Sequence, residues 1–345
     1  MSNTIIPLVS VIIPMRNEER RIAQCLDSVV QTDHPKDRLE IFVVDGMSTD
    51  GTRQIVLEYS KRCPFICLLN NRKHIQAAAL NMGLQKANGE IIIRMDAHTT
   101  YAPDYICQCI TALKITGAAN VGGKQKPIGT GYVSGAIAAA YSSPFAAGDA
   151  KYRYSDEKQW VDTVYLGAWR AQTLIDIGGF DEDWPVNEDY ELNYRLRKNG
   201  GKILLSPKIN CYYYVRDSLS DLARQYVRYG FWKVKTLAAH PDSLRWRQLA
   251  CPILVAALIL SAALIPFSPI CAAIVPVTYI IGNLIASSWT AVCRGLRYLP
   301  LLPVTFVIIN ICWGIGFWAG LAVFSISPII VNSDRLQKQQ PFTEL

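Results

Sequence analysis

An aspartate and a histidine follow a strongly apolar segment, and the two side chains could together hold a metal ion. The three isoleucines at residues 91–93 are typical of a strand buried on both faces, and Asp96-Ala97-His98 follows soon after. Open α/β sheets bind their ligands at the carboxyl ends of the strands. A divalent cation held by Asp96 and His98 would neutralise a diphosphate. An ordinary polar turn after a strand would use the same residues.

Three further carboxylates have types and positions that suit chemistry. Asp45 ends an apolar segment and can accept a hydrogen bond from a nucleobase N–H or a ribose hydroxyl, although Asp-Gly pairs are also common in turns. Glu188 and Asp189 are adjacent, and their repulsion raises the proton affinity of at least one of them. Such a carboxylate can take a proton from an attacking hydroxyl. The other interpretation is an acidic helix start capped by Asn187.

The elements that must position these residues alternate between strand and helix. Apolar segments predict strands at 9–14, 39–44, 65–69 and 91–95, and helical spacing predicts helices at 17–31, 52–59 and 76–87. After residue 103 we expect helices at 104–116 and 189–198, strands at 121–124, 161–169, 203–205 and 211–215, and a mobile loop and helix within 129–159. This alternation predicts an α/β domain whose mostly parallel sheet is covered by helices on both faces.

Two long segments predict a membrane region. Residues 248–293 (46 residues) and 298–333 (36 residues) contain no Asp, Glu, Lys, Arg or His. Because a spanning helix needs about 20 apolar residues, we expect about three spans within 248–331 and a tail at 332–345. Three complete spans would place the C-terminus on the side of the membrane opposite the cytoplasm. The alternative is that residues 325–331 form a re-entrant or interfacial segment. Basic residues on one predicted side place that side in the cytoplasm by the positive-inside rule: Arg224, Arg228, Lys233, Lys235, Arg245, Arg247, Arg294 and Arg297.

Charge and cysteine content exclude some function classes. Residues 1–247 carry 31 Lys+Arg against 26 Asp+Glu, and this mild, mixed charge argues against nucleic-acid binding. The ten cysteines lack the usual zinc or disulfide spacing, so free thiols are expected. We expect residues 219–237 to form a basic, aromatic amphipathic helix along the membrane surface, within a basic amphipathic interfacial segment at 218–247. Residues 1–217 would then form a catalytic domain in the cytoplasm.

Four motifs, taken together, resemble glycosyltransferase family 2. They are Val11–Glu18, Val43–Thr52, Asp96-Ala97-His98 and Asn187-Glu188-Asp189. The resemblance covers roughly residues 8–235. It implies an A-type glycosyltransferase fold that binds a nucleotide sugar. Segments 94–98, 161–167 and 224–230 resemble, more narrowly, membrane-bound enzymes of bacterial exopolysaccharide assembly of the succinoglycan type.

The resemblance also implies a role for each matching position. Asp189 would be the catalytic base, and Asp96 with His98 would replace the family's Asp-x-Asp metal motif. Imidazole suits Mn²⁺ better than Mg²⁺, but the expected cofactor is a divalent cation that could be either of the two. Alternatively, His98 contacts a phosphate of the donor. The nucleotide sugar would be bound by Pro14, Arg16, Asn17, Glu18, Asp45 and Asp96, and the acceptor or diphosphate by Glu188, Gln225 and Arg228.

Two further groups of these residues have structural alternatives. Asn17 and Glu18 would also suit the first turn of a helix. Gln225-x-x-Arg228-Tyr229 is similar to the Gln-x-x-Arg-Trp motif of processive polysaccharide synthases, yet a basic face resting on lipid headgroups would look the same. This sequence has Gly46 at a position where many members of the family carry a second Asp. Only Asp45 is therefore expected to contact the nucleoside.

The expected function is therefore an inverting glycosyltransferase of the bacterial inner membrane, with its catalytic domain in the cytoplasm. It would transfer a sugar from a nucleotide sugar to a lipid-linked saccharide, and the expected donor is a UDP-sugar. The alternatives are a polyprenyl-phosphate glycosyltransferase, a processive polysaccharide synthase and a non-catalytic membrane scaffold. Three spans leave little room for a polymer channel. Asp45, Asp96 and Asp189 argue against a scaffold.

Overall fold

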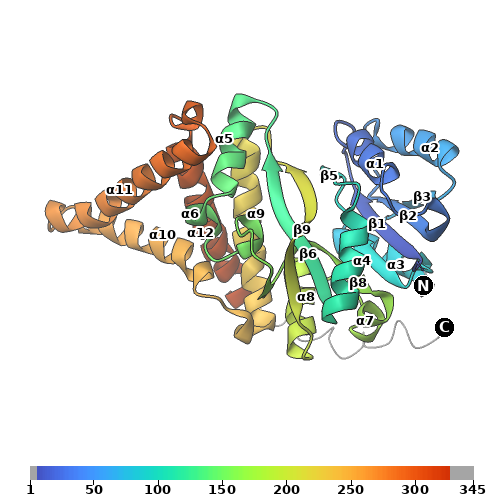
Figure 1. Cartoon of the computed structure of the whole chain (residues 1–345). Helices are drawn as coiled ribbons and strands as arrows, with labels where there is room; N and C mark the ends of the chain where they lie inside the picture. Colours follow the sequence, from blue (N-terminus) through green and yellow to red (C-terminus); the bar gives the residue numbers. More distant parts are fainter. Residues whose placement is uncertain (1–5, 327–345) are drawn as a thin grey trace. The chain divides into compact units, whose positions relative to one another are not determined.

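The computed structural model of the chain describes residues 6–326 (Figure 1). Side chains are described up to residue 324. It divides into two compact units. Unit 1 comprises the described residues up to Lys126 together with Tyr154–Tyr213, and unit 2 comprises Pro127–Arg153 together with the described residues from Tyr214 onward. The expected tail at 332–345, and residues 327–331 of the re-entrant alternative, lie outside the described residues. All ten cysteines are free, as predicted.

Unit 1 is built on a mixed sheet. Its first four strands are parallel in the order β3-β2-β1-β4: β1 (Val9–Met15), β2 (Leu39–Asp45), β3 (Ile66–Asn70) and β4 (Ile91–Arg94). Beyond β4 the order continues with β8 (Tyr165–Arg170), β6 (Asn120–Ile128), β9 (Ile203–Tyr214) and β5 (Thr99–Tyr101), and β7 (Gln159–Val161) pairs with β9. The α/β fold is confirmed, but the parallel arrangement stops at β4. Helical crossovers connect the first four strands, whereas β8 pairs with β4 antiparallel.

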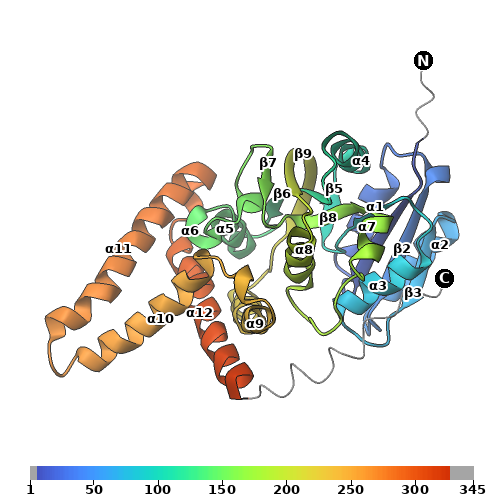
Figure 2. The ribbon, with the colours of Figure 1, turned by 90° about the horizontal axis from the view of Figure 1, so that it is seen from below.

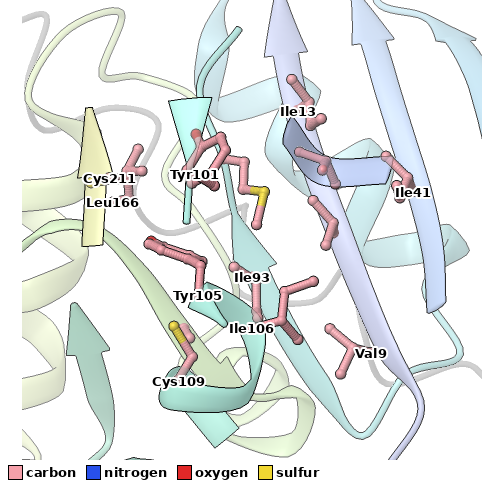
Figure 3. Close-up of a cluster of buried hydrophobic side chains, with 14 of the residues drawn as sticks. Val9, Ile13, Ile41, Ile93, Tyr101, Tyr105, Ile106, Cys109, Leu166 and Cys211 are labelled. Carbon is pink, nitrogen blue, oxygen red and sulfur yellow. The ribbon is translucent and has the colours of Figure 1, made fainter. Parts of the chain in front are cut away.

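Helices cover both faces of the sheet, as predicted. On one face lie α1 (Ile22–Val30), α2 (Thr52–Arg62) and α4 (Tyr105–Thr116), and on the other α3 (Gln76–Lys86), α7 (Ala171–Asp176) and α8 (Glu188–Lys198). Successive strand residues point to opposite faces. Ile93 therefore lies in the same core cluster as Ile106 of α4 (Figure 3). Ile92 belongs to the core cluster on the other face. Figure 2 shows the helices on either side of the sheet. The isoleucine run is thus buried on both sides.

Three expected elements differ from the structure. The helix expected from residue 17 begins only at Ile22, because Asn17 has φ 55°, which a right-handed helix does not allow. The strand expected at 161–169 is divided between β7 and β8, with Leu166 at φ 60°. The two short strands expected after residue 202 form one strand, β9.

Unit 2 contains the apolar helices. It consists of α5 (Tyr132–Tyr141), α6 (Pro144–Ala147), η2 (Lys151–Arg153), α9 (Leu219–Ala239), η3 (Pro241–Ser243), α10 (Arg247–Leu264), α11 (Pro269–Arg294), η4 (Leu296–Tyr298) and α12 (Leu302–Ile326). Among the described residues three helices, α10, α11 and α12, are long and apolar enough to cross a membrane. Their surfaces expose large apolar side chains, including Trp289 at 71% and Ile259 at 65%. Such surfaces suit contact with lipid.

Helix α9 packs along α12 through glycines. A Cβ atom added at Gly230 would lie 2.0 Å from the Trp313 carbonyl oxygen, and one at Gly316 would lie 2.1 Å from the Val227 carbonyl oxygen. Small residues allow helix backbones to approach this closely. The expected interfacial segment 218–247 is therefore fastened to an apolar helix over much of its length, and its place along the membrane surface stays a prediction.

Candidate active site

Residues with strained backbones mark one edge of the sheet of unit 1. Asn17, Met47 and His74 follow β1, β2 and β3, and all three have φ between 55° and 60°. Asn187, directly before α8, has φ 67°. Positive φ is unfavourable for residues other than glycine, and such strain tends to occur at functional sites. The strain therefore points to the carboxyl ends of the parallel strands, where the sequence places its candidate residues.

The loops after β1 and β2 hold each other in place. Thr49 N–H donates to Asn17 Oδ1 at 2.9 Å, and Asn17 N–H donates to Ser48 Oγ at 2.9 Å. Glu18 N–H donates to Thr52 Oγ1 at 2.7 Å. Asn17 and Glu18 therefore precede the helix and join two loops, so the interpretation of these residues as helix N-terminal residues is wrong.

Pro14 and Arg16 flank this loop junction differently. Pro14 is buried in β1 and pairs with Val44, just past the last residue of β1 that pairs with β4. A proline fits there because no ladder bond from its nitrogen is needed on that side. Arg16 is exposed. The nucleotide-binding roles expected for both residues stay predictions.

Asp45 is fully buried and organises the second loop from within. Its Oδ1 accepts hydrogen bonds from the backbone N–H of Ser48 at 2.9 Å and from Ser48 Oγ at 2.6 Å. Its Oδ2 pairs with Arg53 Nη1 at 3.0 Å, and the same Nη1 donates to Asn70 Oδ1 at 2.6 Å. Both carboxylate oxygens therefore have protein partners. The nucleoside contact expected of Asp45 stays a prediction.

Two residues near the third loop were missed by the sequence reasoning. His74 Nδ1 lies 2.9 Å from the Gly46 carbonyl oxygen, which ties the third loop to the second. Gln76 begins α3, and its Nε2 donates to Asp96 Oδ1 at 3.4 Å. The available signal was their position directly after the third parallel strand, because such residues lie at the same sheet edge as Asp96.

A buried arginine joins Asp96 to the expected catalytic pair. Arg94 Nε donates to Asp96 Oδ1 at 3.4 Å, and Arg94 Nη1 forms an ion pair with Glu188 Oε1 at 3.0 Å. The three side chains are 5–10% exposed. Burial raises the pKa of Glu188 to about 7, while the Arg94 charge opposes this rise and Asp189 adds to it. Sequence reasoning missed Arg94, although a cation ending a triple-isoleucine strand was the signal.

Asp189 lies differently from its neighbour Glu188. It is partly exposed, and its Oδ1 accepts the backbone N–H of Tyr190 at 2.7 Å. Asn187 precedes the pair at the helix start, but its side chain makes no capping hydrogen bond. Asn187 Nδ2 is buried without a hydrogen-bond partner among the described residues. The acidic helix start is therefore confirmed, since Glu188 and Asp189 lie in the first turn of α8, but among the described residues the Asn187 side chain does not cap it. Of the two carboxylates, Asp189 is the one with an exposed surface.

His98 is joined to the first loop. Its Nδ1 lies 3.1 Å from Glu18 Oε1, and its ring meets Tyr213 edge-on at a centroid distance of 5.3 Å. A carboxylate on one ring nitrogen is the arrangement that commonly orients an imidazole as a metal ligand. Within residues 6–324, no group of three or more His, Cys, Asp or Glu side chains is arranged to hold a metal ion.

The two remaining predicted residues belong to unit 2. Gln225 and Arg228 lie on α9, where Gln225 is buried and Arg228 is exposed. Gln225 Oε1 accepts from the Tyr141 hydroxyl at 2.8 Å, and its Nε2 donates to the Tyr229 hydroxyl at 2.9 Å. These contacts are internal to unit 2, and the expected contacts with acceptor or diphosphate stay predictions.

Comparisons with known proteins agree with this architecture. The sequence matches the models of Glycosyl transferase family 2 over residues 10–171 and of Glycosyl transferase family group 2 over residues 91–326. The succinoglycan biosynthesis protein ExoA of Rhizobium meliloti (strain 1021) is 31% identical over 317 residues, which are 91% of this chain and 95% of that protein.

Two other proteins show how far the similarity extends. The dolichyl N-acetyl-alpha-D-glucosaminyl phosphate 3-beta-D-2,3-diacetamido-2,3-dideoxy-beta-D-glucuronosyltransferase of Methanococcus voltae is 32% identical over 230 residues, which are 64% of this chain and 71% of that protein. The structure of the mannosyltransferase PcManGT from Pyrobaculum calidifontis in complex with GDP-Man and Mn²⁺ superposes with a TM-score of 0.63 at 23% identity, covering 88% of each chain. That likeness shows the A-type fold. Because the family matches span most of the chain, the chain belongs to glycosyl transferase family 2 and is a glycosyltransferase of the exopolysaccharide type.

Proposed function

We propose that this protein is an inverting glycosyltransferase that adds one sugar from a nucleotide sugar to a lipid-linked saccharide at the cytoplasmic face of a bacterial inner membrane. The observation that carries the proposal is the position of Asp189. It is a reachable carboxylate, and the buried chain Glu188–Arg94–Asp96 links its helix to the strand end expected to bind the diphosphate. The relatives support the acceptor class, since one is named for succinoglycan synthesis and another for a dolichyl-linked sugar.

The donor site would lie at the carboxyl ends of β1 to β4. The joined loops after β1 and β2 would enclose the nucleoside, and Asp45 would keep the second loop rigid. A UDP-sugar is our first expectation. PcManGT was solved with GDP-Man, which makes GDP-mannose the second donor to test.

Asp96 and His98 would hold Mn²⁺ or Mg²⁺. Two protein ligands fit such an ion, because Mg²⁺ in these sites usually takes its other ligands from substrate phosphates and water. The Glu18 contact on His98 Nδ1 fits a ligating imidazole. When bound, the cation stabilises the negative charge of the departing nucleoside diphosphate.

The residues of the chain would perform the transfer in one displacement. Asp189 takes the proton from the acceptor hydroxyl while that oxygen bonds to the anomeric carbon of the donor sugar. The bond from the anomeric carbon to the diphosphate oxygen breaks, and its electron pair leaves with the nucleoside diphosphate. Attack opposite the leaving group inverts the configuration. Glu188 is buried against Arg94, so the proton goes to Asp189.

A donor panel tests this proposal. The full-length protein in membranes is supplied with radiolabelled UDP-glucose, UDP-galactose, UDP-N-acetylglucosamine or GDP-mannose, with and without a bacterial lipid extract. We expect one donor to label the lipid phase, and Asp189→Asn to abolish that labelling. Label that enters polyprenyl phosphate alone, or a long polymer, would establish one of the alternative functions. Release of free sugar without labelled lipid from any donor would overturn the proposed acceptor class.

A further inference from the structure

Unit 2 contains a half-buried arginine that is surrounded by tyrosines. Arg153, at the end of η2, donates from Nη1 to the Tyr226 hydroxyl at 3.1 Å. Its Cζ lies 4.9 Å from the centroid of the Tyr141 ring and 5.8 Å from that of Tyr152. Its Nε is buried without a hydrogen-bond partner, and among the described residues Arg153 forms no ion pair.

This environment leaves a positive charge without a negative one. The guanidinium of arginine stays charged in proteins, and charged side chains that are buried are normally paired. The rings of Tyr141 and Tyr152 compensate only in part, through cation–π attraction. The acidic residue nearest in the preceding sequence, Asp149, pairs instead with Arg247. The charge of Arg153 is therefore available to an anion.

Neutral polar groups surround the guanidinium. The Tyr226 hydroxyl accepts from Arg153, the Tyr141 ring packs edge-on against the Tyr226 ring, and the Tyr141 hydroxyl donates to Gln225. Gln225 in turn donates to Tyr229. We call these five residues the Arg153 cluster; it joins η2, α5 and α9. An arginine fork with hydroxyl groups beside it is chemistry that recognises phosphate.

The position of the cluster within unit 2 limits the kind of anion. Helix α5 contacts α11 and α12, and α9 packs along α12, so the elements that carry the cluster rest on helices apolar enough to cross a membrane. Arg153 itself keeps part of its surface exposed. A phosphate attached to a membrane lipid matches both features.

We infer that the Arg153 cluster binds the phosphate group of a membrane lipid, and that this lipid is the diphosphate-linked isoprenoid carrier of the acceptor. The inference rests on the proposed function for the identity of the carrier. Phospholipid headgroups carry the same phosphate chemistry, so the experiment must separate the two sources.

Binding of farnesyl diphosphate to the full-length protein in detergent tests the inference. We expect Arg153→Gln to weaken binding about tenfold or more, the loss typical of one charge-assisted contact. Arg153→Lys keeps the positive charge but lacks the planar guanidinium. Its affinity for farnesyl diphosphate should lie between that of the unchanged protein and that of Arg153→Gln. Arg297→Gln is the matched control, because exposed Arg297 also lies over a tyrosine ring, 4.7 Å from the Tyr298 centroid, and donates to its hydroxyl. This control should bind as the unchanged protein does.

Each further arm supports or overturns the inference. Farnesol should bind all variants equally, because it lacks the phosphate. Liposomes of phosphatidylglycerol should not displace farnesyl diphosphate; equal displacement would assign the cluster to headgroups and overturn the carrier. Equal affinity of Arg153→Gln, in a sample that elutes and melts as the unchanged protein does, would overturn the phosphate site.

The donor side separates this inference from the proposed function. Hydrolysis of the donor without acceptor should be unchanged in Arg153→Gln, while its KM for the lipid acceptor rises. If donor hydrolysis and lipid labelling are both absent in the unchanged protein, the proposed function fails, whereas the farnesyl diphosphate measurement still decides the phosphate site.

Discussion

The guanidinium of Arg94 lies 3.0 Å from the Glu188 carboxylate, so one buried cation at the end of β4 holds the first residue of α8. The same guanidinium contacts Asp96 at 3.4 Å. Arg94 thereby fixes the expected diphosphate side of the site relative to the helix that carries Asp189. Asp96 and Glu188 are two carboxylates that share one cation. Without Arg94 their negative charges would be buried and uncompensated, so the arrangement depends on Arg94.

Arg94→Met should destabilise unit 1. Removing one partner from a buried ion pair leaves charge uncompensated and typically costs about 3–5 kcal/mol. We expect Arg94→Lys to lose less, because it keeps the charge although it cannot reach both carboxylates. Thermal unfolding of the purified protein measures both. Arg62→Met, a change of an exposed arginine on α2, is the control, and an equal melting temperature for Arg94→Met and the control would contradict the prediction.

Asp189→Asn should remove transfer while keeping donor binding. An amide cannot take the acceptor proton, and loss of a positioned base typically costs about 10²–10⁴-fold in rate. Single-turnover transfer and equilibrium binding of the donor would be measured on the same preparation. Asp176→Asn on α7 serves as the matched acidic control. Activity near that of the unchanged protein would remove Asp189 from the base role.

The pH dependence of transfer should report Glu188. Burial raises the pKa of Glu188 to about 7, so the side chain is ionised above that pH and protonated below it. Protonation removes the charge that attracts Arg94, and we expect the rate to fall as pH drops through 7. Glu188→Gln should lack this inflection. An inflection that persists unchanged in the Gln variant would assign it to another group.

His98→Asp should retain activity and shift the metal preference from Mn²⁺ toward Mg²⁺. A carboxylate oxygen suits the harder cation, whereas imidazole suits Mn²⁺. Titration of each metal against transfer gives the preference, and binding of Mn²⁺ by electron paramagnetic resonance provides a readout without turnover. Glu18→Gln weakens the carboxylate partner of His98 and should lower Mn²⁺ affinity more mildly. Identical metal dependence in all three proteins would exclude His98 as a ligand.

Gly316→Ala should loosen the packing of α9 on α12. The new Cβ would lie 2.1 Å from the Val227 carbonyl oxygen, and such overpacking typically costs about 1–3 kcal/mol. Gly282→Ala on α11 is the matched control, since its Cβ would meet nothing within 4 Å and alanine favours a helix. We expect a lower melting temperature for the first variant and an equal or higher one for the second. The reverse order would contradict close packing at Gly316.

The sequence by itself determined most of the secondary-structure elements of this protein. Runs of apolar residues predicted β1 to β4 closely, and helical spacing predicted α3 and α4 within a residue or two. Local patterns carry this information, because a continuous apolar run marks a strand buried on both faces and helical spacing marks the buried face of a helix. The apolar lengths also predicted the three long helices of unit 2. The order of carboxylates along the chain indicated the family.

Only the tertiary structure decided which of these residues meet. Nothing local predicted that Arg94 contacts Glu188, that Glu18 contacts His98, or that Asn17 leaves the helix to join the second loop. These contacts connect segments that sheet order brings to one edge, and sheet order depends on long-range burial rather than on spacing within a segment. The same holds for Arg153, whose lack of a counter-charge appears only when η2, α5 and α9 are packed together. Whether Arg153 has a counter-charge depends on residues that are distant in the sequence, and only the fold determines which of them lie near it.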